Sequence, residues 1–168
     1  MTPPMTAADV IKLLNLQPLP AEGGLYRQTY ADDYGTAIYY LIGWLETESY
    51  EVTTQAEYSA MHRLPGVEVF HHYAGDPVRM LLLHPDGSQS EPLLGPDLAN
   101  EQRPQVVVPG NTWQGCYSAG DESGVGWSLL GATMAPGYRD EDFEISPAAP
   151  LIDKWPAAEQ QIRALTRR

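Results

Sequence analysis

Three of the four histidines and a glutamate lie within residues 59–75, a stretch whose residue types could carry chemistry. Residues Ser59–Leu64 and Val67–Tyr73 have the character of two strands, and the Pro65-Gly66 pair between them is a strong turn signal. We predict a hairpin, because strands joined by so short a turn ordinarily pair with each other. The polar side chains of the stretch would then gather on a small area of one sheet.

The faces of these two strands decide which side chains meet. Because side chains alternate along a strand, His62 shares a face with Leu64, and Glu68 shares a face with Phe70 and His72. A hairpin brings those faces to the same side of the sheet. We therefore expect His62, Glu68 and His72 to converge among apolar neighbours and to form the floor of a small-molecule pocket.

Proton transfer is the chemistry that these residue types favour. Histidine ordinarily titrates near neutral pH, so His62 is the expected general base. A buried carboxylate needs a partner, and Glu68 would pair with His62 or with Arg27. Arg27 would bind a carboxylate or phosphate group, with a surface charge as the alternative. We predict His62 and Glu68 as catalytic residues, and as substrate-binding residues Arg27, His72, Thr112 and Gln114.

The composition bounds the class of protein and its partners. The 168 residues suit one ordinary domain, and 43% hydrophobic residues suffice for a core. With 22 acidic and 10 basic residues the net charge is −12, which disfavours nucleic acid and anionic membranes as partners. The single cysteine, Cys116, excludes an internal disulfide, and we expect it to be a small buried hydrophobic residue. No signal peptide or membrane span is expected, so we predict a cytoplasmic protein that binds a small molecule.

Turn signals at even spacing predict an all-β fold with helices only at its ends. We predict a jelly-roll barrel over about residues 22–146, with an N-terminal helix over about 7–16 and a C-terminal helix over about 156–166. Residues 36–44 are apolar on both faces, which indicates a strand in the middle of the structure or in an interface. Residues 46–57 are polar and predict a loop.

The central stretch resembles the first sequence motif of the cupins, G-x5-H-x-H-x(3,4)-E-x6-G. His62, Glu68 and Gly75 match its first histidine, its glutamate and its closing glycine. Its leading glycine and its second histidine are replaced by Ala56 and Leu64. The resemblance supports His62 and Glu68 as site residues.

The second cupin motif, G-x5-P-x-G-x2-H-x3-N, is matched less fully. Pro109 matches its proline, whereas Asn111 and Gln114 replace its glycine and its histidine. Trp113 precedes Gln114 and should point away from the pocket, into packing or an interface. Cupin metal sites use histidine and carboxylate ligands, and leucine cannot bind a metal, so no cofactor is expected. A divalent metal, if bound, would use His62, Glu68, His72 and Gln114.

Longer strings resemble one small cupin family known only as a domain of unknown function. These strings lie between Leu16 and Pro156 and include EGGLYRQTY, TAIYYLI, LLLHPDG, LGPDL and RPQVVVPGNTWQG. The resemblance implies a single cupin domain over residues 1–168, folded as a double-stranded β-helix, and a homodimer.

Three functions are compatible with this resemblance. Its nearest functional relatives are metal-free dTDP-sugar epimerases, which use a pocket histidine as base. The first hypothesis is therefore a metal-independent epimerase or isomerase of a sugar-like or keto-acid substrate, in which a tyrosine acid would come from Tyr26, Tyr39 or Tyr73. The alternatives are a protein that binds or senses a small polar or anionic metabolite without turnover, and a metal-dependent, dioxygenase-like enzyme.

Overall fold

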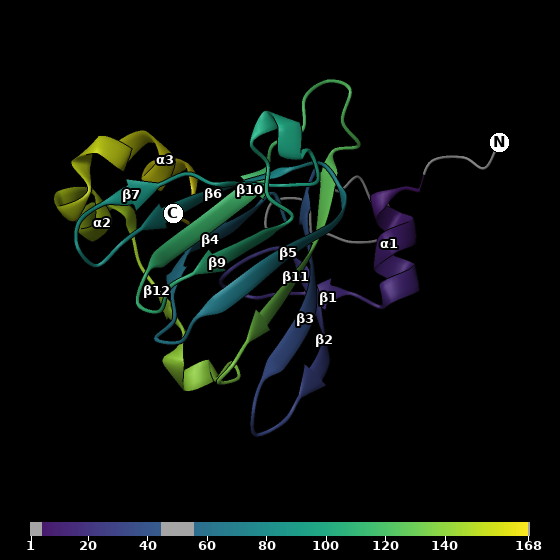
Figure 1. Ribbon diagram of the computed structural model, residues 1–168, viewed down its shortest axis with the longest axis horizontal. Helices are drawn as coiled ribbons and strands as arrows, with labels where there is room; N and C mark the ends of the chain where they lie inside the picture. Colours follow the sequence, from purple (N-terminus) through teal and green to yellow (C-terminus); the bar gives the residue numbers. More distant parts are fainter. Residues whose placement is uncertain (1–4, 45–55, 168) are drawn as a thin grey trace.

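Two antiparallel sheets face each other in the computed structural model, which describes residues 5–44 and 56–167 (Figure 1). The β5 sheet has the strand order β1-β2-β3-β11-β5-β9, and the β4 sheet has the order β12-β4-β10-β6-β7, with β8 paired to β6. The all-β jelly-roll fold is thereby confirmed, whereas most of the predicted loop 46–57 lies outside the described residues. The strands are β1 (Gln17–Pro18), β2 (Leu25–Ala31), β3 (Thr36–Gly43), β4 (Tyr58–Arg63), β5 (Glu68–Gly75), β6 (Val78–Leu83), β7 (Gln89–Ser90), β8 (Leu93–Leu94), β9 (Gln105–Val108), β10 (Trp113–Ser118), β11 (Trp127–Met134) and β12 (Glu144–Ile145).

The predicted hairpin of residues 59–73 is wrong, because its two strands belong to different sheets. β4 pairs with β10 and β12, whereas β5 pairs with β9 and β11. The Pro65-Gly66 turn therefore carries the chain across the edge of the barrel, from one sheet to the other. His62 and Glu68 still line the same space, because the inner faces of the two sheets oppose each other.

Two turn positions of the motifs have left-handed backbone. Gly75 has a φ of 81°, and a Cβ atom there would lie 2.2 Å from the carbonyl oxygen of Trp127. Only glycine permits so close an approach. Asn111, which stands where the motif has glycine, has a φ of 62°, a region that asparagine tolerates better than most residues. The departure at Asn111 thus preserves the turn ahead of β10.

The main hydrophobic core fills the space between the two sheets, where alternate residues of the strands point inward. Burial of this apolar surface is the principal force that holds the sheets together. Cys116 belongs to this core, and burial raises the pKa of its thiol well above the ordinary range, so it packs as expected. The largest members of the core include Tyr40, Ile42, Phe70, Met80, Leu82 and Leu130.

The N-terminal helix α1 (Ala7–Leu14) covers part of the outer face of the β5 sheet. It begins at a capping box, in which Thr6 and Asp9 satisfy each other's backbone amides. It ends earlier than predicted because Asn15 adopts a left-handed conformation with a φ of 53°. Within the described residues, no helix has the length and apolar character needed to cross a membrane.

Short helices near the C-terminus cover the outer face of the β4 sheet (Figure 1). They are α2 (Ala148–Lys154), the 3-10 turn η3 (Pro156–Ala158) and α3 (Glu159–Ala164). The single helix predicted over 156–166 is thus divided, since the amide of Ala158 bonds to a carbonyl three residues back, at Trp155. The apolar side chains of these helices pack on Met61, Leu81 and Leu83.

Strand β3 is apolar on both faces because it is covered on both. It lies between β2 and β11, in the interior of its sheet. Tyr40 and Ile42 join the core between the sheets, whereas Tyr39 and Leu41 belong to the cluster beneath α1. The expected position in the middle of the structure is confirmed, and the homodimer stays a prediction.

Candidate functional site

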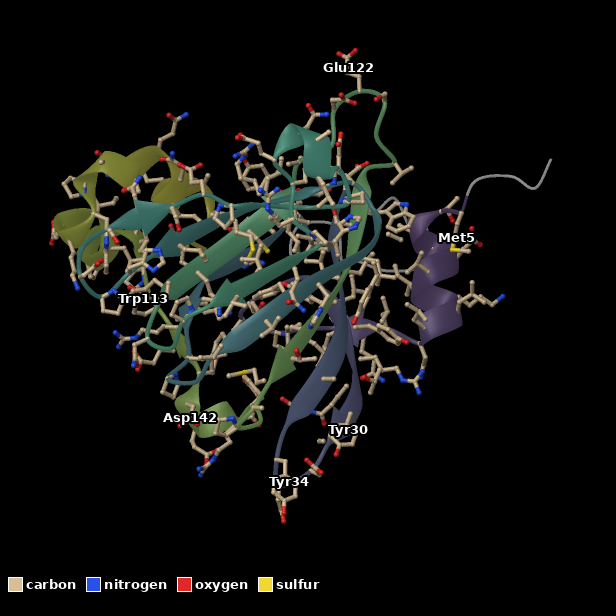
Figure 2. All side chains as sticks on the ribbon, viewed as in Figure 1. Met5, Tyr30, Tyr34, Trp113, Glu122 and Asp142 are labelled. Atoms are coloured by element: carbon tan, nitrogen blue, oxygen red, sulfur yellow. The ribbon has the colours of Figure 1, made fainter. Side chains whose placement is uncertain are left out.

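A cavity of about 450 Å³ opens between the inner faces of the two sheets. Its apolar walls are Leu19, Ile38, Leu64, Phe70, Ala132 and Met134. Its buried and half-buried polar side chains are Glu22, Tyr26, Thr36, Tyr40, His62 and Glu68. The segment that includes η2 (Asp140–Asp142), at the end of the barrel where Asp142 is labelled in Figure 2, contributes exposed side chains that form the mouth. These are Tyr138, Arg139, Asp140 and Glu141.

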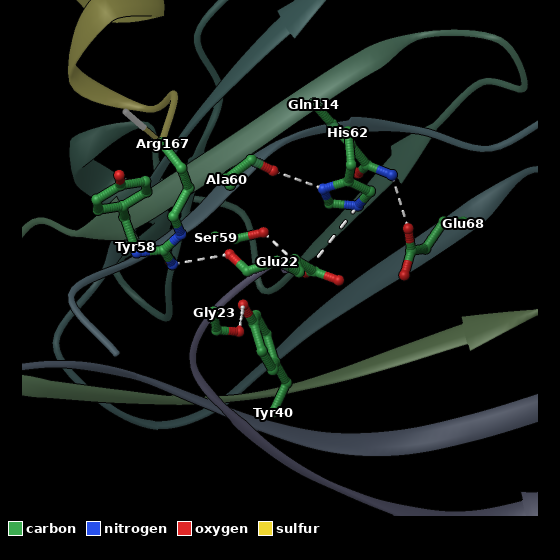
Figure 3. A network of polar contacts seen from close by, with 10 residues as sticks. All are labelled: Glu22, Gly23, Tyr40, Tyr58, Ser59, Ala60, His62, Glu68, Gln114 and Arg167. Atoms are coloured by element: carbon green, nitrogen blue, oxygen red, sulfur yellow. Dashed lines mark hydrogen bonds and ion pairs between the residues drawn. The ribbon is translucent and has the colours of Figure 1, made fainter. Parts of the chain in front are cut away.

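His62 is held in one tautomer. It is only 2% exposed, and its Nδ1 lies 2.8 Å from the carbonyl oxygen of Ala60 (Figure 3). A carbonyl oxygen can only accept, so Nδ1 carries the hydrogen and Nε2 bears the lone pair of the neutral ring. Nε2 lies 4.0 Å from Oε1 of Glu22, and the ring stacks on Phe143 with centroids 5.3 Å apart. The basic nitrogen of His62 therefore has a fixed position and a nearby carboxylate.

A bulge in β4 sets the orientation of His62. The register between β4 and β10 shifts just after Gln114, where β4 has one residue more than its partner. The amide of Ala60 there donates to the carbonyl of Glu22 at 2.8 Å, and the amide of Met61 donates to a carbonyl near the C-terminus at 2.8 Å. The ring of His62 folds back on this bulge and bonds to Ala60.

Glu68 lies at the start of β5, on the opposite wall of the cavity, and is 9% exposed. Its Oε2 accepts a hydrogen bond of 2.7 Å from the side-chain amide of Gln114, which crosses from one sheet to the other. Burial raises the pKa of Glu68 to about 7; His62 opposes this shift, the charge of Glu22 adds to it and the bond from Gln114 opposes it. Near neutral pH both protonation states are present, so Glu68 can give or take a proton.

Gln114 and Thr112 are buried, and neither is among the residues that line the cavity. Gln114 is the register partner of His62 on β10. Neither Oε1 of Gln114 nor Oγ1 of Thr112 has a hydrogen-bond partner among the described residues, although both atoms are buried. A buried acceptor of this kind is ordinarily satisfied by water or by a ligand. Sequence reasoning gave both as substrate-binding residues, and the structure places Gln114 against Glu68 instead of on the cavity surface.

Glu22 is the site residue that sequence reasoning missed. The hydroxyl of Ser59 donates to its Oε1 at 2.8 Å, and its backbone carbonyl accepts from Ala60 and from the guanidinium of Arg167. These bonds fix a carboxylate beside His62, although Glu22 precedes a Gly-Gly pair and resembles an ordinary turn residue. The available signal was its place at the head of EGGLYRQTY, one of the strings on which the family resemblance rests.

Comparison with known proteins identifies the family. The profile described as Cupin superfamily (DUF985) matches residues 8–146. This chain belongs to the cupin superfamily. The family resemblance read from the sequence is therefore confirmed.

Solved structures agree with this assignment. The cupin is similar to a protein from Shewanella oneidensis, with a TM-score of 0.82 and 30% identity over 98% of this chain and 99% of that one. It is also similar to a hypothetical protein from Leishmania major, with a TM-score of 0.82 and 26% identity over 98% and 100%. An oxalate decarboxylase variant from Bacillus subtilis, at 9% identity and a TM-score of 0.55 over 92% and 39%, shares the fold alone. No curated protein matches the chain significantly.

The donor set of this cupin does not fit a metal ion. Leu64, in place of the second histidine of the motif, lines the cavity with an apolar side chain. The side-chain amide of Gln114, which replaces the histidine of the second motif, is bonded to Glu68, and His62 is the sole histidine among the described lining residues of the cavity. In the part of the chain that the structure describes, no three His, Cys, Asp or Glu side chains form a group that could hold a metal.

His72 does not join His62 and Glu68, so the predicted convergence of all three is wrong. Its Nε2 bonds to the backbone carbonyl of Asp76 at 3.1 Å, near the far end of β5. Four residues along a strand correspond to roughly 13 Å, and Phe70 lies between the two side chains. A shared face is therefore insufficient, because distance along the strand also decides which groups meet.

Arg27 lies outside the cavity. It is exposed, and its guanidinium donates to the carbonyl of Leu14 at 3.3 Å. Tyr26 and Gln28, its neighbours on the opposite face of β2, line the cavity instead. Among the described lining residues, Arg139 at the mouth supplies the positive charge, and it pairs with Glu141 of η2.

The tyrosines divide between the two faces of the β5 sheet. Tyr26 lines the cavity, whereas Tyr39 and Tyr73 meet edge to face on the outer side, with centroids 6.1 Å apart. His71 stacks on Tyr73 there and bonds to the hydroxyl of Thr133, because its side chain points away from the face of β5 that carries Glu68. At the mouth, burial and the charge of a nearby aspartate raise the pKa of Tyr138 to about 12, so its phenol is a hydrogen-bond donor at neutral pH.

Proposed function

We propose that this cupin is a metal-independent epimerase or isomerase of a small, sugar-like carbonyl compound. The observation that carries the proposal is the fixed tautomer of His62, whose Nε2 lone pair lies in a cavity that Glu68 lines from the opposite sheet. A general base and a group that exchanges protons near neutral pH thus face a common space. This is the arrangement that moving a proton next to a carbonyl group requires.

In the proposed reaction, His62 on one wall of the cavity acts as the base and Glu68 on the other wall acts as the acid. Nε2 of His62 removes a proton from the carbon beside the carbonyl, and the electron pair of that C–H bond forms the C=C bond of an enediolate, whose negative charge lies on the former carbonyl oxygen. Protonated Glu68 then gives a proton to the other face of the same carbon, or to the neighbouring carbon after the hydroxyl proton of the first carbon has moved to the former carbonyl oxygen. The first outcome is epimerisation and the second is isomerisation. A proton that passes from the imidazolium of His62 to the Glu68 carboxylate through solvent restores the starting state. Glu22 stabilises the imidazolium form of His62 between the two steps.

The charges of the cavity support an uncharged substrate. Two carboxylates, Glu22 and Glu68, lie in the interior beside one imidazole, and they would repel a carboxylate placed next to the reacting carbon. Arg139 lies at the mouth, where it could bind an anionic group at the far end of a substrate. A volume of about 450 Å³ lies in the lower part of the range for ligand cavities, which suits a monosaccharide.

Hydrogen exchange in heavy water tests this function. Neutral aldoses and ketoses, the matching uronic acids and α-keto acids are each incubated with the protein in heavy water, and loss of the C–H signal is followed by proton NMR. We expect exchange at the carbon beside the carbonyl for a neutral sugar, and none for the α-keto acids. Thermal denaturation with each compound reports binding separately from turnover. A sugar that raises the melting temperature but exchanges no hydrogen would overturn catalysis and indicate binding without turnover.

A further inference from the structure

A second cavity, of about 330 Å³, lies on the other side of the β4 sheet, beneath the C-terminal helices. It is lined by Arg63 from β4, Trp113 from β10, and Lys154 and Trp155 from the end of α2. Figure 2 shows Trp113 on the side of the barrel where the C-terminal helices lie. Trp113 points away from the first cavity and packs against the apolar cluster beneath the C-terminal helices, as expected, and it also lines this second cavity.

Aromatic rings and positive charges combine at this site. The guanidinium of Arg63 lies 4.8 Å from the centroid of the Trp113 ring, and the ammonium of Lys154 lies 4.6 Å from that of Trp155. The residues that line the cavity in the described part of the chain include two cations and no carboxylate. In a protein with a net charge of −12, such a concentration of positive charge is a local exception.

Both cations keep unused hydrogen-bond donors. Arg63 pairs with Glu144 at 2.6 Å, and their side chains are 35% and 55% exposed, so water screens the pair. Nζ of Lys154 donates to the backbone carbonyl of Pro85 at 3.1 Å. A guanidinium has five N–H groups and an ammonium has three, so both side chains can also donate to an incoming anion.

We propose that this cavity binds a small organic anion with a flat apolar body, of the aromatic carboxylate class. The carboxylate would accept from Arg63 and Lys154, and the ring would lie against Trp155 and the apolar residues of α2, Pro150 and Leu151. The site does not share a lining residue with the first cavity, so this proposal is independent of the proposed catalytic function.

Fluorine NMR titration of the full chain with para-fluorobenzoate tests the site, and para-fluorobenzamide is an uncharged probe of the same shape. We expect a Kd of about 1 mM or tighter for the carboxylate, and binding at least about tenfold weaker for the amide. Arg63→Gln and Lys154→Gln should each weaken carboxylate binding about tenfold. Arg103→Gln, which changes an exposed arginine outside the cavity, is the matched control and should leave binding unchanged.

Three outcomes would overturn the proposal. They are no binding of the carboxylate at about 10 mM, equal binding of the carboxylate and the amide, and binding that neither Arg63→Gln nor Lys154→Gln weakens. Lys154 is exposed, so its variant keeps the test valid should the partly buried Arg63 be needed for folding. Quenching of the indole fluorescence that is lost in Trp155→Phe would place the ligand at this cavity, because the ring of the ligand would lie against Trp155.

Discussion

The two faces of strands β4 and β10 have opposite chemistry. On the inner face His62 lies beside Gln114, and on the outer face their chain neighbours Arg63 and Trp113 lie beside each other. The inner cavity combines an imidazole with two carboxylates, whereas the outer cavity combines two cations with two indole rings. Because side chains alternate along a strand, the neighbouring residues His62 and Arg63 of β4 line two cavities of opposite charge.

Burial is the difference that decides what each face can do. The side chain of His62 is 3% exposed and that of Arg63 is 35% exposed. In the inner cavity, loss of water shifts the pKa of Glu68 to about 7 and creates a group that exchanges protons near neutral pH. On the outer face the charges stay hydrated, so they attract an anion without acquiring reactivity. We therefore expect catalysis at the inner face and salt-sensitive binding at the outer face.

The largest expected effect is on the inner face. His62→Gln should slow hydrogen exchange of the sugar substrate by about 10²–10⁴-fold, because glutamine cannot accept the proton. The measurement is the exchange rate in heavy water at saturating substrate. His71→Gln is the matched control, since His71 lies on the outer side of the β5 sheet and should keep the full rate. Equal losses in both variants would exclude the assigned role of His62.

The next effect is on stability and its pH dependence. The carboxyl of Glu68 titrates at about 7 in the folded protein against 4.5 ordinarily, so the stability that its protonated form provides at acid pH is lost as the pH rises through 7. Glu68→Gln stays neutral at every pH. Relative to the wild type, its free energy of unfolding should increase by about 3 kcal/mol between about pH 4 and about pH 8. Urea denaturation at both pH values measures the two free energies of unfolding. A difference between the variant and the wild type that is the same at both pH values would contradict the raised pKa of the buried carboxyl.

Ionic strength should affect binding in the outer cavity and not in the inner cavity. Raising KCl from about 0.05 M to about 0.5 M should weaken para-fluorobenzoate binding about fivefold, because the cations of the outer cavity are partly exposed. Binding of a neutral sugar in the inner cavity should not change over the same range. Fluorine NMR and thermal denaturation, respectively, measure the two affinities. Salt-independent binding of the carboxylate would mean that the rings alone hold it.

The smallest effect concerns Glu144, which competes with the anion for Arg63. Glu144→Gln removes the carboxylate that pairs with Arg63 and should tighten para-fluorobenzoate binding about two- to threefold, since exposed ion pairs contribute less than about 1 kcal/mol. The control is Glu159→Gln, which breaks the exposed pair with Arg163 on α3 and should leave the affinity unchanged. Weaker binding in Glu144→Gln would show that the anion does not use the donors of Arg63.

Local patterns were sufficient to predict much of this protein. Alternation along the strands placed His62 and Glu68 on inner faces, and the motif spacing that ends at Gly75 gave the cupin family. The capping box at Thr6 fixed the start of α1. Each of these features depends on residues close together in the chain, so the sequence by itself determined the all-β fold and directed attention to His62 and Glu68, on which the proposed function rests.

Only the tertiary structure decided which groups meet. Strands β4 and β5 belong to two different sheets, and the turn residues between them did not predict this separation. Glu22 lies beside His62, although the two residues are far apart in the chain. Arg139 takes the place at the mouth that Arg27 was expected to occupy, and His72 lies too far along β5 to take part. The outer cavity depends on helix α2 packing over Arg63. These arrangements follow from burying apolar surface between segments remote in sequence, and local residue patterns do not record which remote segments will pack together.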